Sequence, residues 1–268
     1  MRLGLYWYSA TGNTLNLARA AVDVWTALGH SVTAFDMLNE KGETPPSPDS
    51  FDKVVFAFPV MIFRPPLVAR RFAGNLPTAR SPVPAHIMIT SGGMGARSDS
   101  VFAEILEKKG LNVRSAVELV CEDSYIPFRK WFGSFNKKAL PDEGTRKAAE
   151  TFAREVATEN LEKPFAPLGG LVRNFFAGIG KNAPEDAGRS FLGPRELQAE
   201  RCTCCGLCAR LCPTGAIVLD GGHPVVTEKS CVGCCACFNN CPTDAWRLGR
   251  FALKYHYRLP EKQVWRGL

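Results

Sequence analysis

Long apolar stretches are missing from this chain of 268 residues. The longest run, residues 54–63, is flanked by Lys53 and Arg64 and is interrupted by Pro59. It is about half as long as the roughly 20 residues that a membrane-spanning helix needs. The amino-terminal residues carry one charged side chain, Arg2, and no small-residue cleavage site follows it, so we expect neither a secretion signal nor a membrane span. These absences predict a cytoplasmic protein.

Histidine is scarce and hydrolytic motifs are absent. The Walker A, G-x-S-x-G and H-E-x-x-H patterns do not occur in the sequence. We interpret the four scattered histidines as structural or solvent-exposed: His30, His86, His223 and His256. With 46% apolar and 22% charged residues, the composition excludes disordered, collagen-like and coiled-coil chains. It suffices for the core of one large domain or of two small ones.

Cysteine is nearly absent outside one block. Ten of the eleven cysteines lie from Cys202 to Cys241, and Cys121 is the exception. Disulfide-dense domains are typically small and secreted, and an odd total leaves one thiol unpaired. The crowded C-x-x-C pattern therefore favours metal binding over a disulfide framework.

Within this block, the pattern C-x2-C-x2-C-x3-C-P begins at Cys202 and again 29 residues later at Cys231. It resembles the spacing of bacterial two-cluster ferredoxins, in which the fourth cysteine of each run binds the other run's cluster. The resemblance assigns one 4Fe-4S cluster to Cys202, Cys205, Cys208 and Cys241, and the other to Cys231, Cys234, Cys237 and Cys212. Zinc also takes four thiolates, but zinc ribbons use two C-x2-C pairs with a longer spacer, so an iron–sulfur site is favoured.

Two further cysteines of the block have no ligand position in this pattern. Under the 29-residue offset, Cys204 aligns with Gly233 and Cys235 aligns with Gly206. We interpret both as small loop residues that pack near the clusters, and we leave them and Cys121 out of the ligand set.

The first residues predict a strand, a polar loop and a helix in succession. Residues 3–8 form the strand, and residues 9–14 read Ser-Ala-Thr-Gly-Asn-Thr. One apolar helical face follows, formed by Leu17, Ala21, Val24 and Leu28. Loop N–H groups, hydroxyls and the positive end of the helix can converge on one anion. This combination predicts a phosphate site.

Strands and helices alternate through the front half of the chain. Further strands are predicted at 31–35, 53–58, 85–90 and 112–120, with helices near 66–74 and 97–110. This alternation predicts an α/β fold with a doubly wound parallel sheet of five strands, in which ligands bind outside the carboxyl ends of the strands. Three loops would meet there: 9–14, 58–64 and 91–99.

The loop Ser-x-Thr-Gly-Asn-Thr after the first strand resembles the FMN-phosphate loop of flavodoxins. With the cysteine runs, the chain resembles flavodoxin–ferredoxin fusions of anaerobes, being flavodoxin-like over 1–122 and a small α+β two-cluster ferredoxin over 195–250. The resemblance implies that FMN phosphate is bound by Ser9, Thr11, Gly12, Asn13 and Thr14. It implies that the isoalloxazine ring is flanked by Pro59, Val60 and Met61 on one side and by Ser91, Gly92, Gly93 and Gly95 on the other.

The second loop departs from the family pattern. Flavodoxins usually stack Trp or Tyr on the flavin, whereas residues 58–63 here read Phe-Pro-Val-Met-Ile-Phe. Either Phe58 or Phe63 takes the stacking position, or Met61 supplies a polarisable contact.

The remaining segments connect the two predicted domains. Residues 143–160 predict an amphipathic helix of the sheet domain, and residues 168–180 a second helix that packs on either domain or caps the flavin. Residues 125–132 form an aromatic packing segment, and residues 184–194 a hinge. The predicted organisation is an FMN domain, a helical linker, a ferredoxin domain and a basic aromatic tail: 1–165, 166–194, 195–250 and 251–268.

The charge balance argues against nucleic acid once cofactors are counted. Two clusters and an FMN phosphate contribute about −2 each, which lowers the formal net charge of +7 to about +1. The tail interleaves cations with rings: Arg250, Phe251, Lys254, Tyr255, Tyr257, Arg258, Lys262, Trp265 and Arg266. It could dock an acidic redox partner or RNA, but packing back onto the protein is favoured.

These features predict an electron-transfer flavoprotein that connects low-potential one-electron carriers with a flavin through its clusters. One alternative is an FMN-dependent reductase of a small molecule that uses the clusters as internal wiring, which would make the chain an oxidoreductase. Another is a redox-sensing or assembly subunit of a larger complex.

Overall fold

The computed structural model describes residues 1–38, 42–125, 141–158, 170–249 and 256–257. The chain divides into two compact units. The larger holds described residues 1–122, 141–158 and 170–182, and the smaller holds 123–125, 183–249 and 256–257.

The larger unit is built on a sheet of five parallel strands: β1 (Arg2–Trp7), β2 (Ser31–Asp36), β3 (Lys53–Pro59), β4 (Val83–Ser91) and β5 (Leu111–Val120). Their order across the sheet is β2-β1-β3-β4-β5. This order reverses direction beside β1, as in the flavodoxin-like doubly wound fold, and the crevice outside the carboxyl ends of β1 and β3 is where such folds bind ligands. The predicted fold class is confirmed for this unit.

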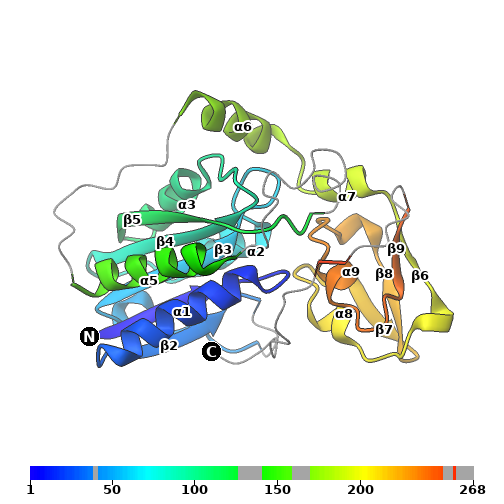
Figure 1. Ribbon diagram of the computed structural model, residues 1–268, viewed down its shortest axis with the longest axis horizontal. Helices are drawn as coiled ribbons and strands as arrows, with labels where there is room; N and C mark the ends of the chain where they lie inside the picture. Colours follow the sequence, from blue (N-terminus) through cyan, green and yellow to red (C-terminus); the bar gives the residue numbers. More distant parts are fainter. Residues whose placement is uncertain (39–41, 126–140, 159–169, 250–255, 258–268) are drawn as a thin grey trace. The chain divides into compact units, whose positions relative to one another are not determined.

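Helices cover both faces of the sheet (Figure 1). They are α1 (Asn13–Ala27) and α5 (Glu143–Thr158) on one face, and α2 (Leu67–Asn75) and α3 (Ser98–Glu107) on the other. A further helix, α6 (Leu171–Asn182), also belongs to this unit, and a short 3-10 helix spans Pro48–Ser50. Covering both faces explains why β3 and β4 are almost entirely buried.

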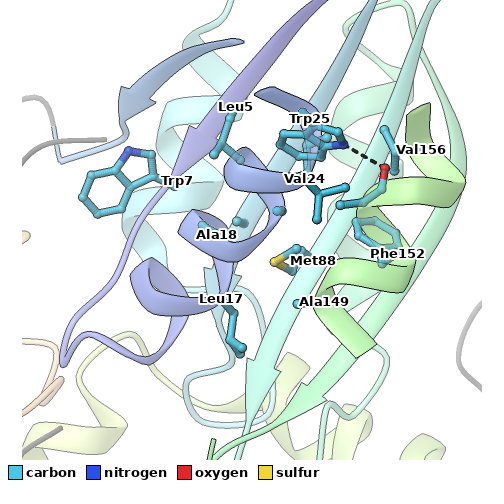
Figure 2. Packing of buried hydrophobic residues seen from close by; sticks show 14 of the residues in the cluster. Leu5, Trp7, Leu17, Ala18, Val24, Trp25, Met88, Ala149, Phe152 and Val156 are labelled. Carbon is cyan, nitrogen blue, oxygen red and sulfur yellow. Dashed lines mark hydrogen bonds between the residues drawn. The ribbon is translucent and has the colours of Figure 1, made fainter. Parts of the chain in front are cut away.

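The core between α1, α5 and the sheet is centred on Trp25 (Figure 2). Its indole is fully buried and donates a 2.8 Å hydrogen bond to the backbone oxygen of Ala153, which ties α1 to α5. Leu28, which the apolar periodicity placed on the buried face, is 43% exposed because the helix ends at Ala27 and Leu28 is its C-cap. Gly29 follows with φ +79°, the left-handed conformation typical of a helix end.

His86 lies in the middle of the sheet and is fully buried. Its Nδ1 is 2.9 Å from the hydroxyl of Ser115 on β5, and its ring meets Phe152 edge-on. Burial, assisted by the charges of Lys53 and Arg114, lowers the pKa of His86 from 6.5 to about 3. The imidazole is therefore neutral in the folded protein, as its predicted structural role requires.

This depressed pKa predicts acid sensitivity of the sheet. Because the folded-state pKa lies below the unfolded value of 6.5, the contribution of neutral His86 to stability is complete above pH 6.5. It is lost as the pH falls toward 3, by up to about 1.4 kcal/mol per pH unit. We expect His86→Gln to flatten the fall of the urea midpoint between pH 6.5 and pH 4.5, measured by far-ultraviolet circular dichroism. His30→Gln, the matched control, should leave the slope unchanged, and equal slopes for all three proteins would contradict the prediction.

The smaller unit is an internal repeat that is visible element by element. It contains α7 (Ala187–Leu192), β6 (Arg195–Leu197), α8 (Leu207–Arg210), β7 (Ile217–Asp220), β8 (His223–Val226), α9 (Ala236–Asn240) and β9 (Trp246–Leu248), with 3-10 turns at Ala199–Arg201 and Glu228–Ser230. A shift of 29 residues superposes β6 on β8, α8 on α9 and β7 on β9. The antiparallel pairs are β6–β9 and β7–β8, so the first strand of one half pairs with the last strand of the other.

The segment before the first cysteine run and the described residues of the tail both pack onto this unit. The segment predicted as a hinge over 184–194 contains α7, whose Gly188 lies against Val232 and Gly233. The described tail residues pack onto α9: His256 stacks on Phe238 with ring centroids 4.0 Å apart. The N–H of Tyr257 donates to Asn239 Oδ1 at 3.0 Å. The other tail residues named above lie outside the described part of the chain, as do residues 126–132 of the aromatic segment.

Candidate functional site

The predicted cluster ligands line two separate cavities of the smaller unit. One cavity is lined by Cys202, Cys205, Cys208 and Cys241, and the other by Cys212, Cys231, Cys234 and Cys237. Each cavity therefore takes three cysteines from one run and the fourth from the other run. This is the crossed grouping that the spacing predicts, whereas the role of the thiols as ligands stays a prediction.

The backbone aims equivalent N–H groups at the sulfurs of both cavities. Cys204 and Gly233 donate to the sulfurs of Cys202 and Cys231, each at 3.4 Å. The N–H groups of Ala216 and Ala245 donate to the fourth cysteines, Cys212 at 3.1 Å and Cys241 at 3.2 Å. N–H donors of this kind stabilise the negative charge of thiolates, and in metal sites they tune the bound group.

The thiols of the second cavity are costly to ionise without a counter-charge. Burial raises the pKa of Cys234 to about 12 and raises that of Cys237 well above its ordinary value. Such thiols lose their protons when a metal binds. In the part of the chain that the structure describes, no three Cys, His, Asp or Glu side chains gather closely enough to hold a single metal ion. The four predicted ligand sulfurs around this apolar cavity are a donor set that would suit an iron–sulfur cluster.

The two extra cysteines occupy strained positions of the cluster loops. Cys204 and Gly233 have φ +53° and +76°, and the other aligned pair, Gly206 and Cys235, has φ +70° and +59°. Each loop thus needs two left-handed residues, and the chain supplies glycine at one and cysteine at the other. Cys204 is exposed, with its sulfur 3.3 Å from His223 Nδ1, whereas Cys235 is buried.

This geometry predicts that Cys204→Gly keeps the full iron content of the protein. Glycine adopts the left-handed conformation without a steric penalty, so the variant should be as stable as the parent or up to about 1 kcal/mol more stable. Cys205→Gly, which removes the neighbouring predicted ligand, should lose the cluster of the first cavity. Iron and sulfide analysis after anaerobic purification checks both variants, and loss of iron from Cys204→Gly would mean that Cys204 is itself a ligand.

The predicted phosphate loop follows β1 in the larger unit. Gly12 has φ +98° and precedes α1, and its N–H donates to Ser9 Oγ at 3.0 Å. Thr14 is buried, and its hydroxyl lies 2.8 Å from that of Thr90 on β4. Among the described residues, no side chain caps α1 by a hydrogen bond and no acidic residue lies in its first turn. The positive end of this helix is thus left for an anion, and the loop fits a phosphate group.

The other two predicted flavin loops contain consecutive left-handed residues. Ile62 and Phe63, with φ +48° and +60°, form a tight turn closed by two backbone hydrogen bonds between Met61 and Arg64, at 3.0 and 3.2 Å. Ala96 and Arg97, with φ +47° and +60°, follow the glycines of the third loop. A β-branched residue such as Ile62 rarely adopts this conformation, and such strain concentrates at binding sites.

Phe58 is not available for stacking on a flavin. Its side chain is fully buried and lies against Phe102 of α3 with ring centroids 4.4 Å apart. Of the side chains considered for that position, Phe58 is therefore wrong, because it is on an inward-facing position of β3. Phe63 is half-buried and contacts Phe176 of α6, with ring centroids 4.7 Å apart.

Helix α6 contacts both loops that the resemblance places beside the flavin ring. Arg64 donates to the carbonyl of Gly180 at 3.2 Å, and Arg97 donates to Asn174 Oδ1 at 3.2 Å. Arg173 forms an ion pair with Glu118, a nearly buried carboxylate on β5 that also accepts a hydrogen bond from Ser91. Of the two packing partners that the sequence left open for this helix, the structure shows the sheet unit. Its apolar periodicity indicated a helix, but no sequence signal identified these long-range contacts.

Comparisons with known proteins find likenesses to both kinds of unit. A ferredoxin-like protein in the vnf region of Azotobacter chroococcum mcd 1 is 46% identical over 53 residues, which are 18% of this chain and 82% of that protein. A flavodoxin from Streptococcus pneumonia TIGR4 has 15% identity and a TM-score of 0.42, covering 59% of this chain and 98% of its own. The flavodiiron core Flv1 from Synechocystis sp. PCC6803 has 16% identity and a TM-score of 0.41, covering 69% of this chain and 37% of its own. No protein-family model matches the chain.

The described helices include no candidate for a membrane span. None of them is both long enough and apolar enough to cross a bilayer.

Proposed function

Because part of this chain belongs to the ferredoxin-like family and its larger unit has a flavodoxin-like fold, we propose that the protein transfers electrons with two 4Fe-4S clusters and FMN. The observation that carries the proposal is the pair of cavities, because the lining of each includes four predicted ligand cysteines drawn from both runs. When bound, the clusters exchange single electrons and FMN accepts one or two, so together they couple one-electron carriers to two-electron chemistry.

The residues of the smaller unit would hold the clusters through thiolates and backbone donors. Cys202, Cys205, Cys208 and Cys241 serve the first site, and Cys231, Cys234, Cys237 and Cys212 serve the second. The N–H groups that point at these sulfurs partly neutralise their charge. The left-handed residues in the loop of each cysteine run would allow that loop to bend around a cluster.

The residues of the larger unit would bind FMN at the carboxyl edge of the sheet. The positive end of α1 and the loop 9–14, with the hydroxyls of Ser9 and Thr11, support phosphate binding. The second and third loops, Pro59 to Met61 and Ser91 to Gly95, would flank the ring, with α6 contacting both loops. Carrying all cofactors on one chain gives them a high effective concentration, so no encounter between separate proteins is needed.

This function requires a reducing cellular compartment. All cysteines are free thiols in the structure, and the cytoplasm keeps thiols reduced. We therefore propose a cytoplasmic protein of anaerobic metabolism that exchanges electrons with protein redox partners.

Anaerobic purification followed by iron, sulfide and flavin analysis tests the proposal. About eight irons, about eight sulfides and one FMN per chain are expected. Colourless protein, or zinc in place of iron, would overturn it. Steady-state turnover of a small acceptor by the isolated protein would instead favour the reductase, whereas full reduction without turnover would favour the carrier.

A further inference from the structure

The internal repeat makes the two cysteine cavities comparable position by position. Every residue that lines the second cavity has a counterpart, 29 positions away, that lines the first. The four predicted ligand cysteines of each cavity are the same in both halves, and so are the proline after the fourth cysteine and the threonine that follows this proline. The largest chemical difference is at one pair: Arg195 lines the second cavity and Pro224 lines the first.

Arg195 is held rigidly beside the second cavity. Its side chain is 1% exposed, and Nη1 lies 3.4 Å from Glu228 Oε2. The backbone N–H of Arg195 donates to Glu228 Oε1 at 3.0 Å, which fixes the strand against the 3-10 turn that precedes Cys231. Its Nη2 is buried and has no hydrogen-bond partner within the described residues. A buried charged donor without an acceptor is costly, so this atom requires one.

The surroundings of Arg195 are negative when the thiols are ionised. Cys231, Cys235 and Cys237 line the same cavity as Arg195, and the carboxylate of Glu228 lies beside it. An arginine guanidinium keeps its charge in proteins. Because Arg195 lines the second cavity, the acceptors that its geometry offers to the buried Nη2 are the sulfurs of that cavity.

Among the residues that line the first cavity there is no arginine or lysine, and the aromatic donor of its wall is neutral. Trp246, the counterpart of Ile217, lines it together with Cys208. An indole donates one neutral N–H. Hydrogen bonds from ionised donors are about twice as strong as neutral ones, so the two cavities differ in electrostatics although their backbones repeat.

We propose that Arg195 donates an N–H to sulfur of the second cluster and that its charge stabilises the negative charge gained when that cluster takes one electron. The inference rests on the proposed function and deepens it: Arg195 makes the two clusters inequivalent. Arg195 and burial have opposite effects on the reduction of the second cluster. Cys231 and Cys237 of the second site are buried, whereas Cys202 and Cys208 of the first are half-buried. Burial disfavours added negative charge, so without Arg195 the second cluster would be hard to reduce.

The test measures both cluster potentials in the holoprotein. A dithionite titration followed by electron paramagnetic resonance gives the potentials, and paramagnetic NMR of the cysteine β-protons assigns each couple to its cysteines. In Arg195→Gln the second cluster should become at least tenfold harder to reduce, a shift of about 59 mV to more negative potential for a one-electron couple. The first cluster should not shift. Arg195→Lys, which keeps the charge, should recover most of the difference.

Two further variants separate tuning from a structural role. Arg247→Gln removes an exposed charge from β9, the strand that pairs with β6, and should move neither potential. Glu228→Gln removes the counter-ion of Arg195 and should shift the second cluster to more positive potential. If the Arg195→Gln protein fails to assemble its clusters, the potential of the second cluster in Glu228→Gln still tests the inference. Clusters present with unchanged second potentials in both variants would overturn the inference alone, whereas protein without 4Fe-4S clusters would overturn the proposed function.

Discussion

Replacing Cys212 with serine is expected to abolish the cluster of the second cavity and to leave that of the first intact. Cys212 belongs to the first run in the sequence, but its side chain lines the cavity of Cys231, Cys234 and Cys237. Serine offers a harder oxygen ligand in place of the thiolate that iron–sulfur clusters prefer. About four of the eight irons should be lost, and those four should belong to the run that does not contain the mutated residue.

The mirror variant makes the experiment decisive. Cys241→Ser should remove the first cluster, because Cys241 lines the cavity of Cys202, Cys205 and Cys208. Iron analysis counts the loss in each variant, and the cysteine β-proton resonances identify the surviving site. Cys204→Ser, which alters an exposed thiol of the same unit, is the control and should retain all irons. If each variant lost the cluster of its own run, the crossed assignment would be wrong.

The crossed assignment of the fourth cysteines also affects how the smaller unit folds. Each predicted site takes residues from both halves, and both strand pairs, β6–β9 and β7–β8, also join a strand of one half to a strand of the other. The apolar core of the smaller unit is modest and includes several of the cysteines themselves, among them Cys208, Cys212, Cys237 and Cys241. We therefore expect cluster binding to supply part of the folding free energy of this unit, as metal does in other small metal-binding domains.

The cysteine cavities could be predicted because the spacing that forms them lies within short segments and occurs twice in the sequence. A run of three cysteines at fixed spacing determines one loop, and the 29-residue offset exposed the aligned pairs Cys204 with Gly233 and Gly206 with Cys235. That all four residues are left-handed was not read from the sequence, yet it explains why glycine and cysteine replace each other there. Cysteine with positive φ carries strain that only the surrounding loop can hold.

The parallel sheet was predictable for a similar reason, since each strand and helix has its own periodicity. The contacts of α6 were not, because Arg173 with Glu118 and Arg64 with Gly180 join residues far apart in the sequence. Phe58 was misassigned because a loop boundary one residue too early turns an inward-facing strand residue into a candidate for stacking. Arg195 was overlooked because an arginine in a short strand carries no motif, and its role depends on burial.

Gly180→Ala is expected to weaken FMN binding by roughly 10- to 100-fold, the equivalent of about 1–3 kcal/mol of overlap. A methyl group at Gly180 would lie 2.6 Å from the carbonyl oxygen of Phe63 and 3.0 Å from that of Ile62. Both atoms belong to the backbone of the tight turn in the second predicted flavin loop, and this backbone cannot move as a flexible side chain can. The overlap must therefore push α6 away from the turn, disturbing the Phe63–Phe176 contact and the hydrogen bond from Arg64 to Gly180.

Gly178→Ala on the same helix provides the matched control. A methyl group there meets no atom within 4 Å, and alanine favours a helix over glycine by about 1 kcal/mol. The two variants make the same chemical change and raise helix propensity equally, so a difference between them isolates the contact with the turn. Fluorescence titration of the FMN-depleted proteins should give an unchanged Kd for Gly178→Ala and a raised one for Gly180→Ala. Equal affinities in both would mean that α6 does not support the flavin loops, because the overlap at Gly180 is then absorbed without reaching the ligand.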